Sequence, residues 1–228
     1  MKDLGKLDSP VWYALQEEHR NFSMHFLNTK FYQPDYCPFG GTIMPGNTKD
    51  DIDEYSKLVE SFYVVGEKPL IPGAVKLVKE LVCLQMICDR TIDVRTSENI
   101  IRLEEANRQE LFSLVNLVQP GYFRTKTSLL GNYYGIFKEE KLIAVTGERM
   151  KMEQFTEVSA VVTYPQHTGK GYATQLIAYE VDNILAENKT AFLHVAETNV
   201  GAIALYKKLG FKTRRKMSFW NFTAVEDL

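Results

Sequence analysis

The sequence predicts an α/β protein with one mixed sheet and helices packed on its faces. From about residue 90 onward, strand and helix patterns alternate in the order β-α-β-β-β-α-β-α-β. Residues 155–163 form a largely apolar run, which is typical of a strand near the centre of a sheet. A proline, two glycines and a helical pattern follow that run directly, so the strand is expected to turn sharply into a helix.

Composition and charge limit the class of protein. The chain has 228 residues, 45% of them hydrophobic, and a net charge of −2, which is typical of a globular protein with a core. Nucleic-acid binding is not expected, because contacts with phosphates need an excess of Lys and Arg. The three cysteines lack CxxC spacing, so neither a disulfide framework nor a metal site is predicted. No signal peptide or membrane span is recognised, and a cytoplasmic protein that does not contact membranes is expected.

The chain is expected to divide into two parts, an N-terminal α/β region (1–90) and a second domain (91–228). The stretch 32–46 is rich in proline and glycine, which predicts a loop. Apolar spacing in the N-terminal region predicts helices over 11–27, 50–58 and 74–88 and a strand over 61–65. None of these elements carries a recognisable chemical motif.

The second part begins with a predicted strand and a helix opened by Asn107, three residues before Glu110 in a capping-box pattern. Pro120 and Gly121 end that helix. The further elements are a hairpin over 133–146, the strand 155–163, a helix after Gly171, a strand over 191–196, a helix over 200–209 and one or two strands over 211–222.

The turn Tyr164-Pro-Gln-His-Thr-Gly-Lys-Gly-Tyr-Ala has the features of an anion-binding helix start. The first N–H groups of a helix have no intrahelical partner, and the helix dipole adds positive charge there. Gly169 and Gly171 allow the backbone to approach phosphate oxygens, and Lys170 adds a charge. The alternative is an ordinary strand-to-helix turn. The spacing of the glycines excludes both a P-loop and a Rossmann GxGxxG motif.

A second motif follows about 25 residues later. Asn199-x-x-Ala202 precedes Leu205-Tyr206 and then Leu209-Gly-Phe211. Together the two motifs resemble the GCN5-related N-acetyltransferase (GNAT) superfamily, in particular its FR47-like branch, over roughly 100–220. The resemblance implies the GNAT acyl-CoA N-acyltransferase fold. Residues 1–90 would then be either a degenerate GNAT-like half or a cap that shapes the acceptor pocket.

The resemblance also implies a binding site for acetyl-CoA. The pantetheine arm would lie between two splayed strands and pair with backbone groups of Val161, Val162 and Thr163. The pyrophosphate would lie on the turn formed by Thr168, Gly169, Lys170, Gly171, Tyr172 and Ala173. The family turn has Arg or Gln where this chain has Thr168. Asn199 matches an asparagine beside the pantetheine arm, and it also stands where the following helix needs an N-cap.

Two residues are expected to carry the proton transfers. Tyr206 matches the family tyrosine that protonates the departing thiolate, although it also fits a core aromatic on one helical stripe. Glu157 matches the position of a glutamate that acts as general base in histone-acetyltransferase members, the alternative being an exposed glutamate at a strand end. Glu148 is a second candidate for the base, and water is a third. His167 and His194 are expected to be structural.

The implied function is transfer of an acetyl (acyl) group from acetyl-CoA to a primary amine. Direct attack in a ternary complex is expected, because neither motif contains a cysteine that could carry an acyl group. The acceptor would be a small-molecule or peptide amine. The alternative function is a non-catalytic module that binds or senses acyl-CoA.

Overall fold

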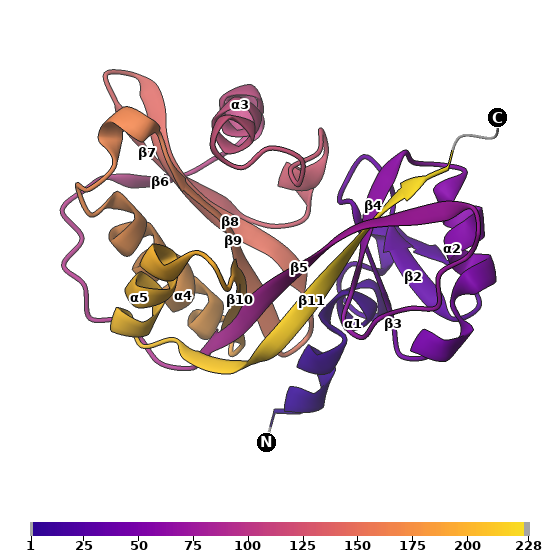
Figure 1. Ribbon diagram of the computed structural model, residues 1–228. Coiled ribbons are helices and arrows are strands. Elements are labelled where there is room, and N and C mark those ends of the chain that lie inside the picture. The colour runs from indigo at the N-terminus through magenta and orange to yellow at the C-terminus, as the bar shows by residue number, and fades with distance from the viewer. Residues whose placement is uncertain (1, 226–228) are drawn as a thin grey trace.

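The computed structural model describes residues 2–225 (Figure 1). The strands are β1 (Ser23–His25), β2 (Thr29–Tyr32), β3 (Phe39–Thr42), β4 (Ser61–Val65), β5 (Val75–Cys88), β6 (Ile100–Arg102), β7 (Tyr133–Lys138), β8 (Lys141–Lys151), β9 (Phe155–Thr163), β10 (Thr190–Ala196) and β11 (Lys212–Ala224). The helices are α1 (Pro10–Gln16), α2 (Lys49–Ser56), α3 (Arg108–Val118), α4 (Tyr172–Ala186) and α5 (Val200–Lys208). Short 3-10 helices are η1 (Leu4–Asp8), η2 (Arg20–Phe22), η3 (Pro45–Asn47), η4 (Glu105–Asn107), η5 (Thr127–Leu129) and η6 (Pro165–His167).

Within these residues, all eleven strands belong to one mixed sheet, in the order β1-β2-β3-β4-β11-β5-β10-β9-β8-β7-β6. The two long strands β5 and β11 run side by side from one half of the molecule into the other (Figure 1). β5 pairs antiparallel with β10 on one side and with β11 on the other. A strand from the N-terminal region therefore completes the sheet of the C-terminal region. The division of the chain at residue 90 stays a prediction, and both parts share this sheet.

The helix expected over residues 74–88 is wrong, because this segment forms β5. The apolar residues of this segment fit the spacing of a helix, and they fit equally well a long strand whose buried residues do not alternate strictly. The β-branched residues Val75, Val78 and Val82 favour an extended chain. What decides the outcome is pairing with β10 and β11, which lie far away in the sequence and leave no local signal.

Smaller differences occur at helix ends. The helix expected over 11–27 ends at Gln16, and β1 follows within that range. At the start of α3, the backbone N–H of Glu104 donates to Asn107 Oδ1 at 3.0 Å. The reciprocal cap is therefore formed by Glu104 and Asn107 around η4, and the predicted pairing of Asn107 with Glu110 is wrong. The β7–β8 hairpin, β9, α4, β10 and α5 confirm the predicted elements.

Helices cover both faces of the C-terminal part of the sheet. Tyr133 and Leu142 pack in a core with α3, whereas their neighbours Tyr134 and Ile143 pack in a core with α4. Since successive residues of a strand point to opposite faces, α3 and α4 lie on opposite sides. α1 packs against β2 and β3 in the N-terminal part. Within residues 2–225, no helix combines the length and apolar character needed to cross a bilayer.

The parallel strands β9 and β10 separate part of the way along their length. They pair only from Thr190↔Phe155 to Phe192↔Glu157. Beyond that point β10 stays paired with β5 as far as Ala196↔Cys83, and β9 stays paired with β8. The facing edge of β9 beyond residue 157 is therefore free of strand partners. This opening positions the site.

Candidate active site

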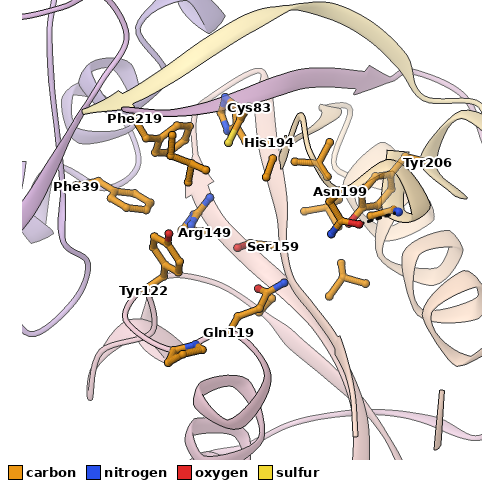
Figure 2. A pocket seen from close by; sticks show the side chains of 18 residues that line it. Phe39, Cys83, Gln119, Tyr122, Arg149, Ser159, His194, Asn199, Tyr206 and Phe219 are labelled. Carbon is orange, nitrogen blue, oxygen red and sulfur yellow. Dashed lines mark hydrogen bonds between the residues drawn. The ribbon is translucent and has the colours of Figure 1, made fainter. Parts of the chain in front are cut away.

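A cavity of about 340 Å³ lies at the opening between β9 and β10 (Figure 2). One wall is backbone and small side chains of the two strands, from Val158 to Val161 and from His194 to Ala196. The size falls within the range of small-molecule sites in proteins. The remaining lining residues are Phe39, Leu81, Cys83, Gln119, Pro120, Tyr122, Arg149, Asn199, Ala202, Tyr206 and Phe219.

The free edge of β9 contains a bulge. Ala160 has φ of 49°, and the register with β8 shifts between Val145↔Val162 and Gly147↔Ser159. A bulge leaves one residue unpaired and bends its strand, and such irregularities are common beside active sites. Here the bend falls on residues that line the cavity. The predicted cofactor-binding residues Val161, Val162 and Thr163 follow it directly on the free edge.

The predicted pyrophosphate turn lies at the end of the same strand. Gly171 is the N-cap of α4, and no side chain caps that helix end. Gly169 has φ of 76° and Gly171 of 78°, in the left-handed region that favours glycine. A Cβ at either position would meet no atom within 4 Å, so backbone conformation, rather than crowding, requires glycine here.

A second hollow of about 300 Å³ lies at this turn. It brings together all the predicted pyrophosphate residues and the end of β9, because η6 folds the chain back between them. Its lining residues are Thr163, His167, Thr168, Gly169, Lys170, Gly171, Tyr172, Ala173, Thr174 and Leu205. The geometry is that of an anion site at a helix start.

Tyr206 lies on α5 and lines the main cavity. Its ring packs edge-on against Phe211, with 5.6 Å between ring centroids. Burial raises the pKa of Tyr206 to about 12, so the phenol keeps its proton at neutral pH. Tyr206 therefore packs against the core and also faces the cavity, and its role as a proton donor stays a prediction.

Asn199 caps α5 and also faces the cavity. Its Oδ1 accepts a hydrogen bond from the backbone N–H of Ala202 at 3.1 Å, which confirms the N-cap of α5. The same residue lines the cavity beside Tyr206 (Figure 2). Contact between Asn199 and the pantetheine arm stays a prediction.

Glu157 is fully buried near the start of β9, so its alternative description as an exposed glutamate is wrong. Arg149 donates to it from Nε and Nη2, both at 2.7 Å, and His194 Nδ1 lies 2.8 Å from its Oε1. Burial alone would raise the pKa of Glu157, but the charge of Arg149 and these hydrogen bonds lower it to about 2. Arg149 and His194 line the cavity, whereas Glu157 does not.

His194 is held in one tautomer by its neighbours. Gln85 Nε2 lies 3.1 Å from His194 Nε2 and donates to the carbonyl of Leu7 at 2.8 Å, while Gln85 Oε1 accepts from Arg214 at 2.9 Å. These partners fix the orientation of the Gln85 amide, so its nitrogen faces the imidazole and His194 Nε2 must accept. His194 therefore carries its hydrogen on Nδ1 and donates it to Glu157. The histidine that was expected to be structural thus connects Glu157 to the cavity wall.

Glu148, the second candidate for the base, is also buried. Its Oε2 accepts from the backbone N–H of Asn132 at 2.7 Å and from Lys151 Nζ at 2.8 Å. Glu148 does not line the cavity. Across residues 2–225, no group of three or more His, Cys, Asp or Glu side chains is arranged to hold a metal ion.

Sequence reasoning missed two features of this site. Arg149 follows the apolar run 142–145 within the same strand, β8, and a long charged side chain so close to a buried segment is the signal that could have marked it. Residues of the N-terminal region also reach the cavity, namely Phe39 from β3 together with Leu81 and Cys83 from β5. This observation favours the interpretation of that region as a cap that shapes the acceptor pocket.

Splayed parallel strands, a bulge on one of them and a glycine turn at a helix start agree with the GNAT fold that the sequence predicts. Residues 133–220 match the family model described as FR47-like protein. No curated protein sequence matches the chain.

Solved structures give matches over nearly the whole chain. A GNAT-family protein from Novosphingobium aromaticivorans is 28% identical, with 96% of this chain and 98% of that chain covered and a TM-score of 0.87. A GCN5-related N-acetyltransferase from Kribbella flavida is 14% identical, with 94% of each chain covered and a TM-score of 0.61. A tandem GNAT protein from the clavulanic acid biosynthesis pathway is 14% identical, with 88% and 79% covered and a TM-score of 0.55.

The fold of the chain is therefore the GNAT fold, extended by an N-terminal α/β region. Residues 133–220 resemble the FR47-like family, and the chain as a whole is similar to proteins of the GCN5-related N-acetyltransferase family.

Proposed function

We propose that the protein transfers an acetyl group from acetyl-CoA to a primary amine by direct attack. The observation that carries the proposal is the alignment of two hollows along β9. The cavity opens onto the free edge of the strand, and the glycine turn follows where the strand ends. A long thioester with a diphosphate at one end fits this arrangement.

The chain offers two sets of backbone groups to acetyl-CoA, which supplies the activated acetyl group as a thioester. Val161 and Thr163, on either side of Val162, present the N–H and C=O groups of an unpaired edge to the pantetheine amides. The residues from Thr168 to Ala173 present the N–H groups of a helix start to the diphosphate. An N–H of the bulged edge near Ala160 is the proposed donor to the oxyanion that develops on the thioester carbonyl.

Tyr206 is the proposed acid. In the reaction a bond forms between the amine nitrogen and the acyl carbon, the C–S bond breaks, and the thiolate takes the phenolic proton. The buried phenol holds its proton at every physiological pH, and the phenolate left after the transfer, being the stronger base, regains a proton from the water that receives the amine proton.

Water is the proposed acceptor of the amine proton. Glu157 and Glu148 are both engaged by buried cations and neither lines the cavity, so each would need an intervening chain of water. We assign Glu157 the role of a positioning residue that holds Arg149 and His194 in the cavity wall. Direct attack is supported by Cys83, the cysteine in the wall, because burial raises the pKa of its thiol to about 12 and suppresses the nucleophilic thiolate.

Binding of acetyl-CoA is tested by titration and by the melting temperature, with a matched pair of glycine variants. Gly171→Ala strains a left-handed position at the start of α4, and Gly66→Ala strains one (φ 119°) in the N-terminal region. Each is expected to cost about 1 kcal/mol of stability. Only Gly171→Ala is expected to weaken acetyl-CoA binding, roughly tenfold or more. Equal binding by both variants would contradict the site.

Turnover is tested by release of coenzyme A thiol with a panel of amines. Thiol release that depends on the amine supports the acetyltransferase. Acetyl-CoA binding without release by any amine would favour the alternative, a module that senses acyl-CoA.

A further inference from the structure

Arg149 has hydrogen-bond donors that Glu157 does not use. Glu157 takes Nε and Nη2, and within residues 2–225 Nη1 has no hydrogen-bond partner. The guanidinium carbon lies 4.7 Å from the centroid of the Phe39 ring, which helps to hold the group in place. Figure 2 shows Arg149 in the cavity wall, with Phe39, Tyr122 and Phe219 on one side and Asn199 and Tyr206 on the other. We call the part of the cavity lined by Phe39, Leu81, Tyr122 and Phe219 the acceptor end, and Arg149 lies beside it with Nη1 unused.

The charge of the cavity wall limits what can bind there. Among the 18 described residues that line it, Arg149 alone carries a permanent charge, and none is Asp or Glu. A polyamine or an aminoglycoside would bring extra ammonium groups into a partly buried site without an anion to balance them. The wall instead suits an acceptor with a single amine and an oxygen that accepts from a guanidinium.

The acceptor end is also strongly apolar. Phe39, Leu81 and Phe219 come from β3, β5 and β11, and Tyr122 adds a fourth side from the loop after α3. The ring centroids of Phe39 and Phe219 lie 5.4 Å apart at an edge-on angle, so these rings form a rigid corner. An apolar side chain on the acceptor would be buried against this corner.

We propose that the acceptor is an α-amino carbonyl compound with a large apolar side chain, and this inference rests on the proposed function. In such a compound the carbonyl oxygen accepts from Arg149 Nη1, and the side chain packs on Phe39 and Phe219. The amine, attached to the same carbon as the carbonyl group, then points toward the free edge of β9. The class contains free amino acids and the N-terminal residue of a peptide, which share this chemistry.

The first test uses the wild-type protein and three matched amines. Phenylalanine, phenylalaninamide and phenethylamine share the ring and the amine, but phenethylamine lacks the carbonyl group. Phenethylamine cannot form the hydrogen bond to the charged donor Arg149. We therefore expect kcat/KM of at least one of the two carbonyl compounds to exceed that of phenethylamine by about 10- to 100-fold. Phenylalanine and a phenylalanyl dipeptide separate the free amino acid from the peptide terminus. Equal or better use of phenethylamine or spermidine would overturn the proposal.

The second test uses variants of Arg149. Arg149→Lys keeps the positive charge but loses the planar guanidinium with its several N–H donors. The preference for phenylalaninamide over phenethylamine is therefore expected to shrink about tenfold. Because that change leaves Glu157 with a poorer partner, the double variant Arg149→Met/Glu157→Gln removes both charges together and should abolish the preference. Arg102→Met, a change at an exposed arginine on β6, is the control and should keep it. A preference that survives in the double variant would overturn the proposal.

Binding separates failure of this inference from failure of the proposed function. With coenzyme A present as the product, calorimetry should show that phenylalaninamide binds about tenfold or more tightly than phenethylamine. If acetyl-CoA neither binds nor turns over, the proposed function fails and this inference falls with it. If acetyl-CoA is used but the amines are treated alike, the acceptor class is wrong and the acetyltransferase stands.

Discussion

Replacing Glu157 by glutamine removes the negative charge from a buried cluster and leaves Arg149 without its counterion. An amide oxygen in the place of Oε1 can still accept from Arg149 Nη2 and His194 Nδ1, but the NH₂ group in the place of Oε2 then faces the donor Arg149 Nε. Breaking a buried pair costs about 3–5 kcal/mol. The lowered pKa leads to a similar figure, because a shift from 4.5 to about 2 corresponds to roughly 3 kcal/mol.

We therefore expect Glu157→Gln to lose about 3 kcal/mol of unfolding free energy and roughly 10 °C in melting temperature. Equilibrium unfolding in urea at pH 7, followed by the fluorescence of Trp12 and Trp220, measures the change. The double variant Arg149→Met/Glu157→Gln should recover most of the loss, because it leaves no charge unpaired.

The same variant distinguishes a positioning residue from a general base. If Glu157 took the amine proton directly, Glu157→Gln would lower kcat by about 10²- to 10⁴-fold while the protein kept its stability. A single variant within about 0.5 kcal/mol of the wild type would refute the reasoning from burial.

Three further outcomes are expected. Tyr206→Phe should lower kcat for thiol release by about 100-fold with acetyl-CoA affinity unchanged, and full activity would show that water protonates the thiolate. Asn199→Ala removes the N-cap of α5 and should lose about 1 kcal/mol of unfolding free energy, whereas Asn199→Ser keeps a capping oxygen and should keep the stability. A raised KM for acetyl-CoA in both variants would support contact with the pantetheine arm, and an unchanged KM in both would count against it. Glu180 on α4 is fully buried, and neither carboxyl oxygen has a partner within the described chain. Burial, with a smaller contribution from Glu148, raises its pKa, so the folded state keeps the proton after the unfolded state has lost it. The contribution of Glu180 to the free energy of unfolding is therefore at its full value below pH 4.5, about the pKa of the group in the unfolded chain. It falls by up to about 1.4 kcal/mol per pH unit as the pH rises above that value. Glu180→Gln should flatten that decline in urea titrations between pH 5 and 8, and an unchanged slope would contradict the assignment.

The C-terminal part of the fold was predictable because its signals are local. The glycine turn requires left-handed backbone, the apolar strand before it is continuous, and Asn199 caps the next helix, so each element is specified by residues close to it in sequence. Two motifs at a fixed separation then indicate how these elements combine. The residues of the turn lie together in the structure as the sequence predicts.

The parts that escaped prediction depend on distant partners. β5 has the spacing of an amphipathic helix and becomes a strand because β10 and β11 flank it. Glu157 is assigned from its offset in the sequence, but its surroundings come from Arg149 on β8 and His194 on β10. The acceptor end is built from side chains on four separate segments, and no window of sequence contains them together. Such features follow from tertiary contact alone.

The position of β5 has a consequence for any attempt to divide the protein. Cutting the polypeptide after residue 90 would strip β10 and β11 of the strand that separates them and expose two rows of unsatisfied amides and carbonyls, which favours aggregation. During synthesis the same strand leaves the ribosome long before either neighbour, so completion of the sheet must wait for the last strand of the chain. A C-terminal fragment made by such a cut would need a separate peptide spanning 75–88 to fill the gap between β10 and β11.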